Sequence, residues 1–111
     1  MDSKELATKI SQILDDKKGM DIEVIDVADK TVLADYFVIV SGNSTTHIKA
    51  LAGEVEYVLK NECGIVADHV EGHNTNRWVL IDYKDVVVHV FHPEDRANYN
   101  LEKLWEGKRE A

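Results

Sequence analysis

One stretch decides the fold of this chain: Trp78-Val79-Leu80-Ile81-Asp82-Tyr83-Lys84-Asp85-Val86-Val87-Val88-His89-Val90-Phe91. Two runs of β-branched and aromatic residues meet at an Asp-Tyr-Lys-Asp segment, a pattern that predicts a β-hairpin. We expect Tyr83 and Lys84 to form a two-residue turn. The cross-strand pairs that follow from this turn are Asp82 with Asp85, Ile81 with Val86, Leu80 with Val87, Val79 with Val88 and Trp78 with His89.

The two faces of this hairpin differ in character. Side chains alternate between faces along a strand, so one face is wholly apolar and is expected to belong to the core. The other face is mostly apolar but ends in Asp82 and Asp85, which is typical of a docking surface for an apolar and basic partner. A central hairpin covered by helices on both sides would show the same pattern. The core face is expected to carry Val79, Ile81, Val86, Val88 and Val90, and the other face Trp78, Leu80, Val87, His89 and Phe91.

Length and composition indicate a single domain over residues 1–111, with 44% hydrophobic and 31% charged residues. Thirteen basic against twenty-one acidic residues give a net charge of -8. Such a chain is repelled by phosphate backbones and attracted to basic proteins, so we expect no direct binding of nucleic acid. Charged residues interrupt the N-terminus, and no apolar run reaches the length of a membrane span. We therefore expect no contact with a membrane and a cytoplasmic location.

The rest of the chain predicts the element order α-β-β-α-β-β-β-α, an α+β fold. The first helix begins at a capping box, the second is amphipathic and ends at Gly64, and the closing helix begins near Pro93. The segments on which this order depends are a helix from Asp2-Ser3-Lys4-Glu5 to Lys17, strands at Ile22 to Val27 and Tyr36 to Val40, a helix from Ile48 to Leu59, a weak strand at Val66 to Val70, the hairpin, and a helix carrying Leu101, Leu104 and Trp105.

Motifs for catalysis are not found. The Ser41-Gly42-Asn43-Ser44 segment has one glycine and no lysine, so it is interpreted as a turn that caps the following helix, not as a phosphate loop. The five histidines lack the spacing of a metal site, and Cys63 stands alone as an expected buried residue at a helix end. We therefore expect no catalytic residue, no metal and no cofactor.

Several blocks of the sequence, in this order and spacing, resemble the ribosomal silencing factor family, also called Iojap or RsfS. The resemblance runs from about Leu6 to Trp105 and implies a mixed five-stranded sheet flanked by helices, with a nucleotidyltransferase-like topology. Catalytic nucleotidyltransferases place Gly-Ser before an Asp-x-Asp pair, whereas this chain has Ser41-Gly42 and no Asp-x-Asp. The blocks are Asp35-Tyr36-Phe37-Val38-Ile39-Val40-Ser41-Gly42-Asn43-Ser44, Glu71-Gly72, Trp78 to Tyr83, Asp85 to Phe91, and Tyr99-Asn100-Leu101-Glu102-Lys103-Leu104-Trp105.

This resemblance implies a translational repressor that is not an enzyme. It would bind the large ribosomal subunit through a basic ribosomal protein, number fourteen of the large-subunit set, and block association with the small subunit, especially in nutrient limitation. The alternative is a small nucleotide-binding or nucleotidyltransferase-type enzyme. An apolar hairpin surface also favours a homodimer of the free protein. The docking positions that the resemblance implies are Trp78, Leu80, Asp82, Tyr83, Asp85 and Val87.

Two positions depart from the pattern of the resembled family. Lys84 stands where the family usually has Gly, and Asn98 stands where it often has an aromatic residue. A lysine with positive φ at the turn would be strained by about 1 kcal/mol. The departure at Lys84 therefore bears on the local geometry of the turn.

Overall fold

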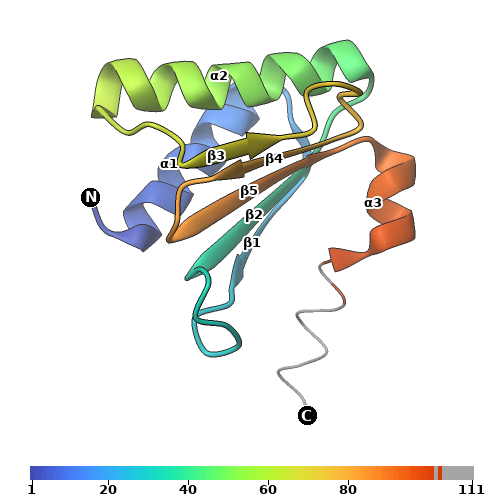
Figure 1. Ribbon diagram of the computed structural model, residues 1–111. Helices are drawn as coiled ribbons and strands as arrows, with labels where there is room; N and C mark the ends of the chain where they lie inside the picture. The colour runs from blue at the N-terminus through green and yellow to red at the C-terminus, as the bar shows by residue number, and fades with distance from the viewer. Residues whose placement is uncertain (102, 104–111) are drawn as a thin grey trace.

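The computed structural model describes residues 1–101 and residue 103. Its elements follow the order predicted from the sequence, and they form an α+β fold with helices on both sides of one sheet (Figure 1). The bounds are α1 (Ser3–Asp16), β1 (Met20–Asp26), β2 (Tyr36–Ser41), α2 (Thr45–Cys63), β3 (His69–Glu71), β4 (Trp78–Asp82), β5 (Val86–Phe91) and α3 (Pro93–Tyr99).

The five strands form one mixed sheet in the order β1-β2-β5-β4-β3. Strands β2 and β5 run parallel, and all other neighbours run antiparallel. Helices α1 and α2 lie together on one face, while α3 follows β5 at the end of the sheet (Figure 1). The hairpin predicted from the sequence therefore places β5 at the centre of the sheet, with one face beneath α1 and α2.

Local signals determine where α1 and α2 begin and end. Asp2 accepts the backbone N–H of Glu5 at 2.8 Å, and the Glu5 carboxylate accepts the N–H of Asp2, which is the predicted capping box. Ser44 accepts the N–H of His47 at 3.1 Å at the start of α2, and Gly64 ends that helix with φ of +67°. The interpretation of the Ser41–Ser44 segment as a capping turn is confirmed.

The register of the hairpin differs from the predicted one. Asp82 lies opposite Val87, not Asp85, and the shift continues to Trp78, which lies opposite Phe91 and not His89. The turn falls at Lys84 and Asp85, one residue later than expected, and is closed by a 2.9 Å hydrogen bond from Tyr83 N–H to the Val86 carbonyl. A one-residue shift of a turn moves every pair by two residues, so the assignment of side chains to faces is unchanged.

Two contacts explain this position of the turn. The Tyr83 side chain is only 7% exposed and packs with the core beneath the helices, a place that a turn residue could not take. The Asp85 carbonyl accepts the backbone N–H groups of Asp35 and Tyr36 at 2.7 and 3.1 Å, which ties the turn to the start of β2. The ring of Tyr83 and the neighbouring strand together fix the register.

The core has two layers. The larger lies between the sheet and the pair α1 and α2, and it includes all five residues predicted for the core face of the hairpin, each fully buried. The smaller lies on the opposite face of the sheet around Ile39 and Phe91, where Leu101 packs against it. The helix predicted to carry Leu101 ends earlier than expected, because α3 stops at Tyr99 and Asn100 caps it in the left-handed region with φ of +51°. Leu104 and Trp105, also predicted for that helix, lie outside the described residues. None of the helices in the described part of the chain has the length and apolarity needed to cross a membrane.

Two smaller expectations need correction. The weak strand predicted from Val66 to Val70 is only three residues long and begins at His69, and Val66 itself is 69% exposed before the strand. Cys63 ends α2 as expected but is half-buried, not fully buried.

Candidate docking surface

The face of the sheet opposite α1 and α2 is only partly covered. Strand pairing places its side chains in rows across the sheet, with His69 and Glu71 at the β3 edge. The positions on β4 and β5 are apolar except for Asp82 and His89. Helix α3 buries none of its own residues there. We call this surface the open face. Its rows are His69–Asp82–Val87–Phe37, Glu71–Leu80–His89–Ile39 and Trp78–Phe91–Ser41.

Four of the six residues predicted for docking share this face. Trp78, Leu80, Asp82 and Val87 are each half-buried on it, which leaves part of every side chain accessible to a partner. Asp85 is exposed in the turn at the end of the same hairpin. The structure thus brings five of the predicted residues together around one apolar surface with acids at its rim.

Tyr83 does not lie on this face. Its side chain points to the opposite side of the sheet and belongs to the core beneath the helices. Burial, together with the nearby carboxylate of Glu56, raises the pKa of the Tyr83 phenol. Its hydroxyl oxygen is buried and has no hydrogen-bond partner among residues 1–101 and 103. Tyr83 therefore supports the hairpin from beneath and is out of reach of a partner on the open face.

Trp78 is the largest side chain on the open face, and aromatic rings hold it from two sides. Its ring stacks on Phe91 at 4.8 Å between centroids and meets Tyr99 of α3 at 4.7 Å. Its indole Nε1–H donates to Nδ1 of His89 at 3.1 Å. His89 is 5% exposed at the centre of the sheet, where burial lowers its pKa to about 4. The histidine is therefore neutral at physiological pH.

Ion pairs attach α3 beside Trp78. The guanidinium of Arg77 donates from Nε and Nη2 to the two carboxylate oxygens of Asp95, each at 3.1 Å. Such a bidentate ion pair restricts the relative orientation of the two side chains as well as the distance between them. Because Arg77 precedes Trp78 and Asp95 lies in α3, this pair keeps Tyr99 close to the indole.

The hairpin turn carries the acidic rim of the open face. Asp82 Oδ1 accepts the backbone N–H of Lys84 at 2.7 Å, and Lys84 has φ of +71°. The Lys84 ammonium is 4.0 Å from the Asp68 carboxylate, an exposed pair that contributes little to stability. The positive φ that the sequence led us to expect at Lys84 is thus present, and the Asp82 side chain supports it.

Three further residues near this face were not predicted from the sequence. Phe37 lies beside Val87 across the parallel pair and is half-buried. Val32 and Leu33, in the loop before β2, are 103% and 81% exposed. This loop leads to Asp35, which is bonded to the hairpin turn, so the apolar pair lies at the same end of the sheet. Two adjacent apolar residues in a polar connecting segment were the signal available in the sequence.

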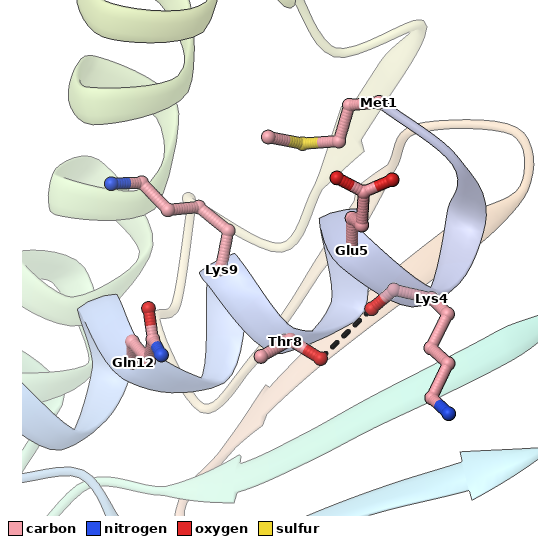
Figure 2. Close-up of a pocket in the computed structure, with 6 residues that line it drawn as sticks. All are labelled: Met1, Lys4, Glu5, Thr8, Lys9 and Gln12. Carbon is pink, nitrogen blue, oxygen red and sulfur yellow. Dashed lines mark hydrogen bonds between the residues drawn. The ribbon is translucent and has the colours of Figure 1, made fainter.

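Other candidate sites in the structure offer less. A hollow of about 320 Å³ lies at the start of α1, and Figure 2 shows the residues that line it. Thr8 donates there to the Lys4 carbonyl at 2.9 Å. All its lining residues come from the first part of the chain, on the side of the sheet away from the open face. Within the described ranges, no three His, Cys, Asp or Glu side chains are grouped so that they could hold a metal ion. The open face is the surface on which the predicted residues of β4 and β5 meet.

Comparison with known proteins gives consistent results. A protein of Halalkalibacterium halodurans named ribosomal silencing factor RsfS is 43% identical over 105 residues, which cover 95% of this chain and 89% of that protein. A more distant mouse protein, named mitochondrial assembly of ribosomal large subunit protein 1, is 36% identical over 98 residues, 84% of this chain and 42% of its own length. A crystal structure of a Chromobacterium violaceum protein matches with a TM-score of 0.92 at 39% identity, and the match covers 96% of this chain and 88% of that one.

The family comparison agrees with the fold and with the residues that first suggested it. The family described as "Ribosomal silencing factor during starvation" matches residues 1–111. The bacterial relatives named ribosomal silencing factor RsfS carry the name of a regulatory protein. This chain belongs to the ribosomal silencing factor (RsfS) family.

Proposed function

We propose that this protein binds the large ribosomal subunit and blocks its association with the small subunit. Family membership supports a role in silencing ribosomes. The observation that carries the proposal is the open face, where Trp78, Leu80 and Val87 form a half-buried apolar surface beside two acids of the hairpin, the half-buried Asp82 and the exposed Asp85. Binding by such a surface needs no catalytic group, because a bound protein excludes the other subunit by its volume.

Charge supports a basic ribosomal protein as the partner. The chain has a net charge of -8, so it is repelled by exposed ribosomal RNA and attracted to basic protein surfaces. Asp82 and Asp85 would meet lysine or arginine side chains at the rim, while the apolar surface is buried at the centre. In the family that this sequence resembles, the partner is ribosomal protein number fourteen of the large subunit. We extend that partner to this chain as part of the proposal.

The six predicted docking residues are expected to have different roles in binding, because they differ in burial. Trp78 is proposed as the main contact residue of the interface. Truncation of a large aromatic side chain in the middle of an interface commonly costs about 2 kcal/mol or more of binding free energy. Leu80 and Val87 extend the apolar surface, and Asp82 and Asp85 set charge complementarity at its edge. Tyr83 acts indirectly, by holding the hairpin register from the core side.

The test is sedimentation of the purified protein with isolated large subunits. Two variants are compared, each with one valine changed to lysine. Val87→Lys puts a positive charge on the open face, where it should oppose a basic partner and weaken binding at least tenfold. Val66→Lys makes the same change at a position that is 69% exposed and lies off that face, so its binding should equal that of the wild type. A photo-crosslinking residue at position 87 should then label one basic ribosomal protein. Equal binding by both lysine variants, or a crosslink only to RNA, would contradict the proposal.

A further inference from the structure

The hydrogen bond between Trp78 and His89 fixes the protonation pattern of the histidine. An indole N–H can only donate, so His89 Nδ1, 3.1 Å away, must be the bare nitrogen that accepts. The proton of the neutral ring therefore lies on Nε2. Burial at the centre of the sheet disfavours a second proton and keeps Nδ1 available as an acceptor.

The other ring nitrogen of His89, Nε2, takes no part in this hydrogen bond. Nε2 is buried, and none of the residues in the described ranges provides it with a hydrogen-bond partner. A buried donor without an acceptor destabilises a folded protein. Two aromatic rings pack against the imidazole, with the Phe37 centroid 5.1 Å from the His89 centroid in an edge-on contact and the Phe91 centroid 6.1 Å from it. A phenylalanine would fill this space without an unpaired donor, so packing alone does not call for a histidine.

The histidine restricts the orientation of the Trp78 indole. Stacking on Phe91 and contact with Tyr99 fix the plane of the Trp78 indole, but flat apolar contacts allow the ring to turn or slide within that plane. A hydrogen bond from one corner of the indole removes that freedom. The ring is thereby held in a single orientation before any partner arrives.

We propose that His89 is a positioning residue, whose Nδ1 holds the Trp78 indole in the orientation that binds the ribosomal partner. This inference rests on the proposed function. His89 itself touches no partner, because it is 5% exposed beneath the indole. Its effect on affinity comes from preorganisation, since an anchor that is already oriented loses less freedom on binding.

Two substitutions separate this role from packing. His89→Phe keeps a ring in the same space and removes the acceptor, and it should weaken binding to isolated large subunits roughly threefold to tenfold. Its melting temperature should change little, because the removal of the unpaired Nε2–H offsets the loss of the acceptor for the Trp78 indole N–H. His89→Asn places an amide oxygen near the position of Nδ1 and should restore binding to within about twofold of the wild type.

A spectroscopic signal reports the hydrogen bond without any partner. The indole ¹H–¹⁵N resonance of Trp78, identified by its persistence in Trp105→Phe, should move toward the position of an unbonded indole in His89→Phe. It should return toward the wild-type position in His89→Asn. If His89→Phe does not fold, benzothienylalanine at position 78 removes the donor without changing the shape of the side chain and should weaken binding by the same factor.

The outcomes distinguish this inference from the proposed function. Loss of binding in Trp78→Ala together with wild-type binding in His89→Phe and in the benzothienylalanine protein would overturn the positioning role and leave the proposed function intact. Absence of binding by the wild type would overturn the proposed function and, with it, the positioning role on that partner. An unmoved indole signal in His89→Phe would overturn the inference whatever the binding result. Agreement of the signal shift, the weaker binding and the rescue by Asn supports it.

Discussion

The Asp82 carboxylate accepts the backbone N–H of Lys84 at 2.7 Å, across a turn in which Lys84 has φ of +71°. Asp82 is therefore both a member of the open face and the side chain that closes the hairpin turn. It lies opposite Val87, so it does not face Asp85 across the ladder. The charge of Asp82 is expected to act in binding a basic partner, whereas its acceptor oxygen supports the turn. Different substitutions of Asp82 can separate these two effects.

Asp82→Asn removes the charge and keeps an oxygen that can accept the Lys84 N–H. We expect its free energy of unfolding to stay within about 0.5 kcal/mol of the wild type, while Asp82→Ala should lose about 1 kcal/mol with the turn bond. Both changes, and Asp85→Asn, should weaken binding to large subunits and reduce its dependence on salt. Binding measured at two salt concentrations checks this, with Asp15→Asn on α1 as the control. Identical salt slopes in all variants would mean that these acids are only solvated turn residues.

Tyr83→Phe should not affect docking. The Tyr83 hydroxyl is buried and lacks a partner within the described part of the chain, so its removal should leave stability equal or raise it by up to about 1 kcal/mol. Tyr83→Ala, in contrast, should cost about 3 kcal/mol or more, because the ring fills the core beneath the helices. Denaturant unfolding and sedimentation with large subunits measure the two effects. A loss of binding in a fully stable Tyr83→Phe protein would show that the hydroxyl reaches the partner after all.

Stability should fall in mild acid because of His89. Its pKa is about 4 in the folded protein against an ordinary value of 6.5, so between these pH values the unfolded chain binds a proton that the folded chain does not. The contribution of His89 to the free energy of unfolding should therefore be complete above about pH 6.5. It should be lost as the pH drops toward 4, which lowers the free energy of unfolding by up to about 3 kcal/mol. His89→Phe should remove this part of the pH dependence. Parallel pH profiles for the two proteins, from denaturant unfolding, would contradict the assignment of a buried neutral histidine.

Lys84→Gly should stabilise the turn. A non-glycine residue in the left-handed region costs about 1 kcal/mol, and the Lys84–Asp68 pair that would be lost is exposed and weak. The greater freedom of glycine in the unfolded chain offsets part of this gain, so we expect a net increase of up to about 1 kcal/mol. Thermal unfolding of Lys84→Gly beside Lys84→Ala, which keeps the strain, measures it. A glycine variant less stable than the alanine variant would contradict strain at this position.

The sequence predicted most of the fold because its signals are local. The capping box at Asp2, the left-handed Gly64 and the alternation of the hairpin each depend on a few neighbouring residues, and all are present. Alternation also placed Trp78 and Val87 on one face, since a register error of two residues leaves the faces unchanged.

The predicted register and the predicted place of Tyr83 in the turn were wrong, because both depend on residues far away in the chain. The backbone N–H groups that hold the Asp85 carbonyl come from Asp35 and Tyr36, and the core that receives the Tyr83 ring comes from the helices. The Trp78–His89 hydrogen bond was likewise invisible, because it joins diagonal neighbours in a register that the sequence did not specify.

Trp78→Ala should give a folded protein that no longer binds large subunits. Its side chain is half-buried, and α3 stays attached through the Arg77–Asp95 pair, so the fold should survive with a lower melting temperature. Binding should fall by more than tenfold, since truncation of such an anchor costs about 2 kcal/mol or more. Tyr57→Ala is the matched control, because that ring is 65% exposed on α2, away from the open face. Circular dichroism and sedimentation separate folding from binding, and an unfolded Trp78→Ala protein would mean that this residue belongs to the core.

Joining of isolated large and small ribosomal subunits, followed by light scattering in the presence of excess protein, tests most directly whether this chain silences ribosomes through its open face. The wild type and Tyr57→Ala should reduce the amplitude of joining in proportion to the large subunits that they occupy, while Trp78→Ala should leave joining complete. Complete joining in the presence of saturating wild-type protein, or equal inhibition by Trp78→Ala, would contradict the proposed role of this surface.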